Sequence, residues 1–279
     1  TTLALIEAAS LALGKSLWGR HPAHPGRTAI VTREDSREIL VARLREILSA
    51  MALEGHSIDQ AIKNLLILDL IETDFKLCQI VNDEVRPHWQ HIDRLCAALQ
   101  PWQPDWVIFD PLVPFGVGES RINDAEQGLI EAFRLIRTRL NCCVEGIHHS
   151  GKANAREKTT DQYTGRGGSA LADGCRMVAV LQPLSDKEWF MATGIPLQTG
   201  ESGLVMALPK LSFVSPQAPI YIKRAGFAFA MVNTAPRSSE QVAATAAQLV
   251  LDFLGREYQL GHRYSKHDLD QQIDLLHLY

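Results

Sequence analysis

Short apolar runs alternate with helical patterns along most of this chain of 279 residues. Runs such as TAIVT (28–32) and WVIFD (106–110) are rich in β-branched and aromatic residues, which is typical of buried strands. After the first run, Ser36 is a predicted helix cap, and apolar residues then recur at helical spacing as far as Leu48. Strands that alternate with helices predict an α/β fold, with a mainly parallel central sheet and helices on both faces.

The same patterns predict the remaining elements. We expect helices over 1–14, 88–99 and 124–140, and strands over 65–70, 143–147, 177–182 and 204–208. After about residue 233, the run TAPRSS indicates a linker, followed by helices over 239–254 and 265–278, the second opened by Ser265. The expected domains are therefore a core over 1–234 and a linker with a helical segment over 235–279. That segment has the pattern of either the start of a winged-helix-like domain or a plain packing helix.

Charge and cysteine content exclude several classes of protein. The net charge of -4 excludes a generally basic surface, so any contact with nucleic acid has to be confined to a local patch. The five cysteines include no C-x-x-C pair, which favours reduced thiols in a cytoplasmic protein over a disulfide scaffold or a zinc site. We find no secretory signal and no apolar run of membrane-spanning length, and so expect no membrane partner.

The run Gly14-Lys15-Ser16 imitates the end of a phosphate-binding loop. Such a loop has the pattern G-x-x-x-x-G-K-[ST], in which backbone N–H groups and the lysine bind the phosphates. Here Ala9 stands where the first glycine is required, and the residues before Gly14 have a helical pattern. We therefore predict that Gly14 ends the first helix, with Lys15 near the negative end of the helix dipole.

Polar residues follow three of the predicted strands. Glu34 and Asp35 follow the strand over 28–32, Asp110 ends WVIFD, and His148 with His149 follow the strand over 143–147. In an open parallel sheet, ligands bind at the carboxyl ends of the strands, so these side chains are expected to meet at one edge. An aspartate after an apolar strand is the Walker B arrangement for holding Mg²⁺, although such residues also serve as helix caps.

Five blocks of the chain, taken in order, carry a family resemblance. They are TTLALIEAASLALG, TAIVTREDSREILVARLREIL, WVIFDPL, VEGIHHSGKA and RGGSALADGCR. Over residues 1–234 the chain resembles plasmid-encoded hexameric replicative DNA helicases of the RepA type, which are RecA-like P-loop ATPases. The resemblance implies a RecA-like core that binds ATP and Mg²⁺. It also implies that Thr1 ligates Mg²⁺ as the last residue of Walker A, that Thr2 lies near the α-phosphate, and that the glycine loop and its lysine lie upstream of residue 1.

The resemblance also implies roles at the catalytic site. Glu34 corresponds to the base that polarises the attacking water, Asp110 to the Walker B carboxylate, and His148 and His149 to the sensor of the γ-phosphate. Because adjacent strand residues face opposite ways, we expect only one of the two histidines to face the nucleotide. The alternatives are that Glu34 and Asp35 are first-turn helix acids and that the histidines lie in a surface loop.

Two further cations are implied to act on the site of a neighbouring subunit. Arg176 corresponds to the arginine finger of the family, and Lys210 is a second candidate with less support. A finger that acts in trans requires a homo-oligomer, expected to be a hexamer. The alternative for Arg176 is a strand-flanking residue paired with Asp173.

The stretch over 150–168 is rich in glycine, threonine and lysine, and we expect it to be mobile. Its cations are candidates for binding the backbone of single-stranded DNA: Lys152, Arg156, Lys158 and Arg166. Tyr163 is its one aromatic ring, so the contacts should be mainly to phosphate. The alternative is an ordinary solvated loop.

These expectations lead to three functions. The first is an ATP-hydrolysing DNA helicase or translocase of a plasmid- or phage-type replication system, acting as a ring with active sites between subunits. The second is a DNA-dependent ATPase that remodels or loads proteins without unwinding. The third is a nucleotide-regulated binding module that does not hydrolyse ATP.

Overall fold

The computed structural model describes residues 1–279 except 54, 118–121, 166, 233–238 and 264–279. The chain divides into two compact units, the first made of Thr1–Val180 with Leu208–Pro216, the second of Leu181–Ala207 with Gln217–Tyr279. The boundary predicted after residue 234 and the helix predicted over 265–278 lie outside the described residues. Within the described part of the chain, no helix is long and apolar enough to cross a membrane.

The first unit is built on a parallel sheet of four strands in the order β2-β1-β5-β6. The strands are β1 (Thr28–Thr32), β2 (Leu65–Asp69), β5 (Trp106–Asp110) and β6 (Cys143–Gly146). Thr32 at the end of β1 is in register with Asp69 on one side and Asp110 on the other. The carboxyl ends of these three strands are therefore level, and the residues that follow them share one edge of the sheet.

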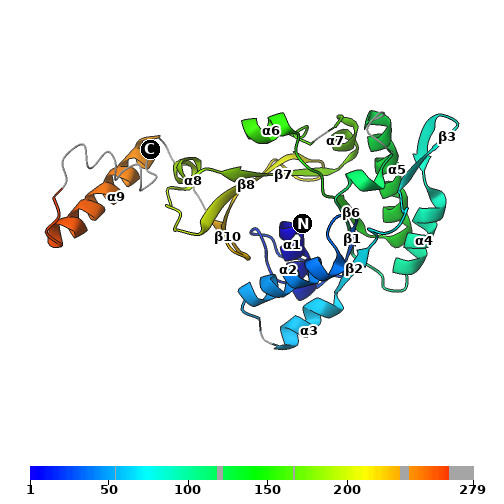
Figure 1. Cartoon of the computed structure of the whole chain (residues 1–279), viewed down its shortest axis with the longest axis horizontal. Coiled ribbons are helices and arrows are strands. Elements are labelled where there is room, and N and C mark those ends of the chain that lie inside the picture. Colours follow the sequence, from blue (N-terminus) through cyan, green and yellow to red (C-terminus); the bar gives the residue numbers. More distant parts are fainter. Residues whose placement is uncertain (54, 118–121, 166, 233–238, 264–279) are drawn as a thin grey trace. The chain divides into compact units, whose positions relative to one another are not determined.

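Helices cover both faces of this sheet, as Figure 1 shows, and the predicted α/β class is confirmed. On one face lie α1 (Thr2–Leu13), α2 (Arg37–Ala50) and α3 (Gly55–Lys63), and on the other lie α4 (Trp89–Leu99) and α5 (Ile122–Leu140). Alternate residues of β1 and β5, including Val31 and Phe109, pack with α4 and α5 in the larger core. The smaller core joins the first three helices through residues such as Ala9, Leu44 and Ala61. Burial on both faces explains the continuous apolar runs of the strands.

Two predicted helix ends are confirmed. Gly14 follows α1 with a left-handed φ of 65°, and its N–H donates to the carbonyl oxygens of Ser10 and Leu11. Glycine adopts this conformation without steric cost, so it ends the helix and provides no phosphate loop. At the start of α2, the Ser36 hydroxyl accepts a hydrogen bond from the N–H of Ile39. This cap begins the helix that follows β1.

Smaller elements complete the first unit. They are the antiparallel hairpin of β3 (Cys78–Val81) and β4 (Glu84–Pro87), the 3₁₀ turn η1 (Val113–Phe115), α6 (Lys152–Glu157) and α7 (Ala170–Gly174). The sequence patterns did not predict the hairpin. At its turn, Asn82 and Asp83 both have positive φ, at 51° and 65°. Asn and Asp are typical of such turns, so this pair was the available signal.

The second sheet corrects one expectation. The strands predicted over 177–182 and 204–208 form β7 (Met177–Leu184) and β8 (Glu201–Leu211), but they do not extend the parallel sheet. They belong to a sheet in the order β10-β9-β8-β7, completed by β9 (Ile220–Ala225) and β10 (Ala228–Val232). β9 pairs antiparallel with both β8 and β10. The short turn between β9 and β10 allows only a hairpin, whereas parallel strands need a long crossover.

Two helices belong to the second unit. α8 (Asp186–Thr193) begins with a reciprocal cap in which Ser185 and Glu188 bind each other's backbone N–H groups. Its Trp189 is fully buried and lies edge-on to Tyr221 of β9, with ring centroids 6.4 Å apart. α9 (Ser239–Gln259) is the helix predicted over 239–254, and it continues five residues further.

Candidate active site

Asp110 and Thr1 lie together at the carboxyl edge of the parallel sheet. Asp110 ends β5 and is 5% exposed, and its Oδ2 atom lies 3.9 Å from the Thr1 nitrogen. Thr2 is the first residue of α1, so it is held beside the same edge. The structure thus brings together the two residues predicted to hold Mg²⁺.

Glu34 is tied to this site through the backbone. The N–H of its neighbour Arg33 donates to the carbonyl oxygen of Asp110 at 3.1 Å. The Glu34 N–H donates to the Thr32 hydroxyl at 3.3 Å, and that hydroxyl donates in turn to the Asp35 carbonyl. Glu34 therefore follows β1 in a turn that is fixed beside the end of β5.

His149 faces Glu34, whereas His148 does not. The Nε2 atom of His149 lies 3.6 Å from Oε2 of Glu34, and both side chains are more than half exposed, at 66% and 59%. His148 packs against Gly165, where a Cβ atom would lie 2.9 Å from its ring. Only a glycine permits this approach. The two adjacent histidines thus have different surroundings, and which of them faces a nucleotide stays a prediction.

Asp35 takes the structural role that was the alternative for the two acids. Its carboxylate forms an ion pair with Arg43, in the second turn of α2, and it immediately precedes the helix cap Ser36. A carboxylate at this position also interacts favourably with the helix dipole. Of the two neighbouring acids, Glu34 faces His149 and Asp35 faces the helix.

Arg33 fastens the loops around the site, and the sequence patterns did not predict this. Its guanidinium donates to the carbonyl oxygens of Thr73 at 2.7 Å, Phe75 at 2.9 Å and Pro114 at 3.0 Å. Lys76 donates to the same Pro114 oxygen at 2.7 Å, and burial together with the charge of Arg33 lowers the pKa of Lys76. The segments after β1, β2 and β5 are joined by these bonds. Because every acceptor is a backbone oxygen, no side-chain pattern could reveal them.

The carboxyl group of Glu145 lies near those of Asp110 and Glu7. Glu145 belongs to β6, and its pKa is raised to about 7 by burial and then by the nearby charges of Glu7 and Asp110. Glu7 of α1 accepts a hydrogen bond from the indole of Trp18 at 2.8 Å, and burial raises its pKa as well. A glutamate inside the apolar run CVEGI was the sequence signal that this residue is unusual.

Arg176 lies exposed between α7 and β7. Among the residues that the structure describes, no ion pair holds its guanidinium, and it has no contact of this kind with Asp173. The Asp173 carboxylate instead accepts a hydrogen bond from the Tyr163 hydroxyl at 2.9 Å. The exposed position is compatible with action on another subunit, and the role of Arg176 stays a prediction.

Lys210 and Glu126 hold the two ends of α7. The Lys210 ammonium donates to the carbonyl oxygens of Ala172 and Asp173, at 2.8 and 2.9 Å. At the other end, the buried Glu126 carboxylate of α5 accepts from the N–H groups of Gly168 and Leu171, at 2.7 and 3.0 Å. Lys210, predicted to act on nucleotide, thus has two partners within its own chain. Glu126 was missed because its partners are backbone groups.

The stretch over 150–165 contains regular structure, and its mobility stays a prediction. It contains α6 and is closed by a backbone bridge between Ser150 and Gly165 and a hydrogen bond from the Gly151 N–H to the Thr164 carbonyl. Thr164 is buried at 2% exposed, and its hydroxyl donates to the Asp161 carbonyl. Short local hydrogen bonds of this kind fold a polar loop without an apolar core.

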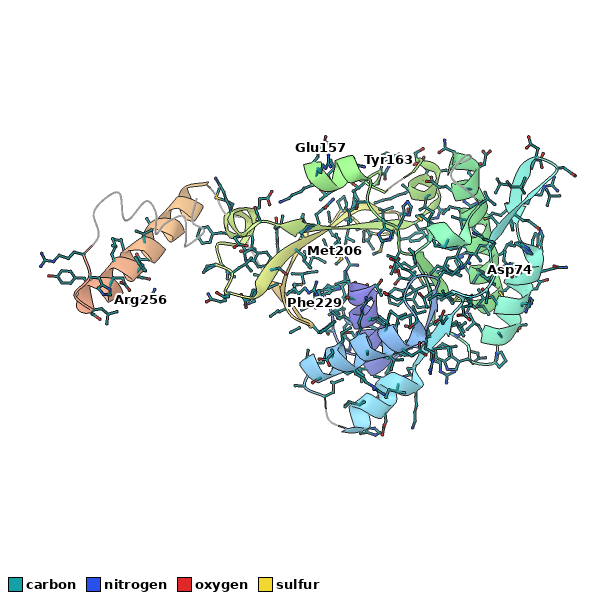
Figure 2. The ribbon with its side chains drawn as sticks, viewed as in Figure 1. Asp74, Glu157, Tyr163, Met206, Phe229 and Arg256 are labelled. Carbon is teal, nitrogen blue, oxygen red and sulfur yellow. The ribbon has the colours of Figure 1, made fainter. Side chains whose placement is uncertain are left out.

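Two of the four predicted DNA-binding cations have described side chains. Arg156 is exposed at the end of α6, and Lys158 follows it in a left-handed conformation with φ 52°. The side chain of Lys152 and the whole of Arg166 lie outside the described residues. Figure 2 shows Tyr163 close to α6 and on the same side of the first unit as Glu157. Tyr163 is 47% exposed, so part of its ring is open to solvent.

The residues at the sheet edge fit a magnesium nucleotide in part. Mg²⁺ prefers carboxylate and hydroxyl oxygens, and the buried Asp110 beside Thr1 provides that donor set. Within the described ranges, no three His, Cys, Asp or Glu residues are grouped to hold a metal ion by themselves. A magnesium ion here would therefore depend on the nucleotide for its other ligands, which is usual for this ion.

Comparisons with known proteins identify a family for the chain. The family designated AAA_25, described as an AAA domain, matches residues 1–155, which is more than half of the chain. The comparison with curated proteins finds no match. Among solved structures, the chain is similar to a KaiC-like protein, PH0186, from the hyperthermophilic archaeon Pyrococcus horikoshii OT3. The identity is 10%, the TM-score is 0.49, and the alignment covers 83% of this chain and 85% of the other.

Proposed function

Because the chain belongs to the AAA domain family AAA_25, a family of P-loop ATPases, we propose that it is an ATP-driven DNA translocase or helicase. In this proposal, copies of the chain form a ring, which the resemblance to RepA-type helicases implies is a hexamer. ATP and Mg²⁺ bind at the carboxyl edge of the parallel sheet. The energy of hydrolysis moves single-stranded DNA past the stretch over 150–168.

One observation carries the proposal: Glu34 and His149 meet beside the position of Asp110 and Thr1. These residues come from different segments, and only the parallel sheet brings them to one edge. A magnesium ion, when bound, would neutralise the charge on the phosphates, with Asp110 and Thr1 as its protein ligands. Glu34 is exposed enough to meet a water molecule and can orient it and accept its proton.

His149 has a separate role in the proposal. Its Nε2 atom lies 3.6 Å from the Glu34 carboxylate, so a proton or a hydrogen bond on that nitrogen acts directly on the base. Arg176 of an adjacent copy completes the site, because a planar guanidinium matches the charge that develops on the transferred phosphoryl group. A single copy would therefore have an incomplete site.

Support for DNA as the partner comes from the stretch over 150–165. Arg156 is exposed on it, and part of the Tyr163 ring is open to solvent, so the stretch offers a cation and one stacking surface. Cations that follow the backbone, with aromatic rings for bases, are the usual means of binding single strands without sequence preference. We expect this binding to weaken steeply as the salt concentration rises.

The test is ATP turnover by the full-length protein, with and without single-stranded DNA. We expect turnover that single-stranded DNA stimulates, and strand displacement on a forked duplex. Stimulated turnover without strand displacement would favour an ATPase that remodels or loads proteins. The absence of turnover with single-stranded DNA present would overturn the proposal and leave a binding module.

A further inference from the structure

Exposed apolar residues lie close to Arg176 along the backbone. The loop that follows β8 exposes Phe213 at 82% and Val214 at 58%, and Met177, next to Arg176, is exposed at 51%. Phe213 has the largest exposed fraction among the large apolar residues of the described chain. Burying such side chains releases free energy in proportion to the area removed from water, so their exposure is costly unless a partner covers them.

A backbone hydrogen bond holds the segments of these residues side by side. The Ser212 N–H donates to the carbonyl oxygen of Arg176 at 2.9 Å, which holds the loop of Phe213 and Val214 beside the start of β7. In the sequence, Arg176 comes just after α7, whose ends are held by hydrogen bonds with Glu126 and Lys210. The backbone that carries the guanidinium is therefore fixed by hydrogen bonds on both sides.

We propose that Met177, Phe213 and Val214, the contact patch, dock against a second copy of this chain and bring Arg176 to that copy. The inference rests on the proposed function, in which Arg176 acts in trans, and it identifies the surface that makes the approach possible. The apolar side chains supply binding free energy, and the guanidinium among them supplies the specificity.

Charge complementarity selects a second copy as the occupant. Arg176 is exposed and has no ion pair among the described residues, whereas the edge of the parallel sheet carries the exposed carboxylate of Glu34. Each copy thus presents the cation of Arg176 next to the contact patch and the carboxylate of Glu34 at the edge of the parallel sheet. A contact between two different surfaces of identical chains repeats from copy to copy and generates a ring or a filament.

The first experiment measures self-association of the full chain by sedimentation, without ATP turnover as a readout. We expect the double variant Phe213→Ser with Val214→Ser to associate more weakly by on the order of tenfold or more. The matched control is Ile80→Ser, which removes an apolar side chain of similar exposure, 53%, from the β3–β4 hairpin. Far-ultraviolet circular dichroism and thermal unfolding should show that both variants fold like the unsubstituted chain. A monomeric unsubstituted chain, or equal association of all three proteins, would overturn the proposal.

The second experiment identifies what covers the contact patch. A photoreactive phenylalanine analogue replaces Phe213, and the protein is irradiated with and without single-stranded DNA. We expect crosslinks between two chains that map near Glu34 or Asp110. Crosslinks to DNA, or only within one chain, would overturn the proposal and assign the patch to another occupant. A chain that crosslinks as expected but does not hydrolyse ATP would keep this interface and overturn the proposed function alone.

Discussion

His149 Nε2 lies 3.6 Å from Glu34 Oε2, although the two residues follow different strands of the parallel sheet. Neither side chain is buried, so the pair is not required by packing. Its position beside Asp110 and Thr1 is the reason why we propose a role for the pair in ATP hydrolysis.

Replacing Glu34 should remove the base and leave the fold intact. We expect Glu34→Gln to lower ATP turnover by on the order of 10²–10⁴-fold, because general base catalysis contributes about that much. Nucleotide binding should be unchanged, as measured with a fluorescent ATP analogue. The control is Asp35→Asn, whose side chain pairs with Arg43 instead. Equal loss of turnover in both variants would contradict the assignment of Glu34.

Arg176 should be needed in a different copy from Asp110. We expect Arg176→Ala to lower turnover by about 10³–10⁵-fold, as for other arginine fingers. Mixing it with Asp110→Ala should restore part of the activity, because some sites then combine an intact Asp110 with an intact Arg176. Turnover is measured over a series of mixing ratios, and no recovery at any ratio would point to a role within one chain.

A substitution of Lys210 can distinguish a structural role at the end of α7 from a role at the nucleotide of a neighbouring copy. If Lys210 only holds the end of α7, Lys210→Met should lower the free energy of unfolding by about 1–2 kcal/mol, because two carbonyl oxygens lose their donor. If it acts on nucleotide in a neighbour, turnover should fall while stability is kept. Urea unfolding and ATPase assays distinguish these outcomes, with the exposed Lys187→Met as the control.

Glu145 should make stability depend on pH. Its folded pKa of about 7 is above the ordinary value of 4.5, so the folded chain keeps a proton that the unfolded chain has lost. Stability should therefore fall as the pH rises from about 4.5 to 7 and stay level above. At one pKa unit per roughly 1.4 kcal/mol, Glu145→Gln should gain up to about 3 kcal/mol at pH 8 and little at pH 4.

The measurement for Glu145 is thermal or urea unfolding across that pH range. The exposed Glu157→Gln should show no comparable gain at high pH. A Glu145→Gln variant whose advantage is the same at pH 4 and pH 8 would show that the carboxyl group does not titrate in this window.

The parallel sheet could be predicted closely because its strands are short, apolar on both faces and ended by polar residues. TAIVT and WVIFD became β1 and β5 with the expected ends. β9 and β10 escaped because only part of each is buried, so their apolar residues do not stand out. At the sheet edge, the positions of Glu34 and Asp110 after β1 and β5 could be predicted from the strand patterns, and their roles stay predictions. Arg33 and Glu126 could not be predicted, since their partners are backbone groups distant in sequence.

The hydrogen bond from the Arg33 N–H to the Asp110 carbonyl has a consequence for how this chain can change. It joins main chain to main chain, so the spacing between the backbones of Glu34 and Asp110 does not depend on which side chains they carry. A related chain in which either carboxylate is replaced by another side chain could therefore keep the same backbone separation.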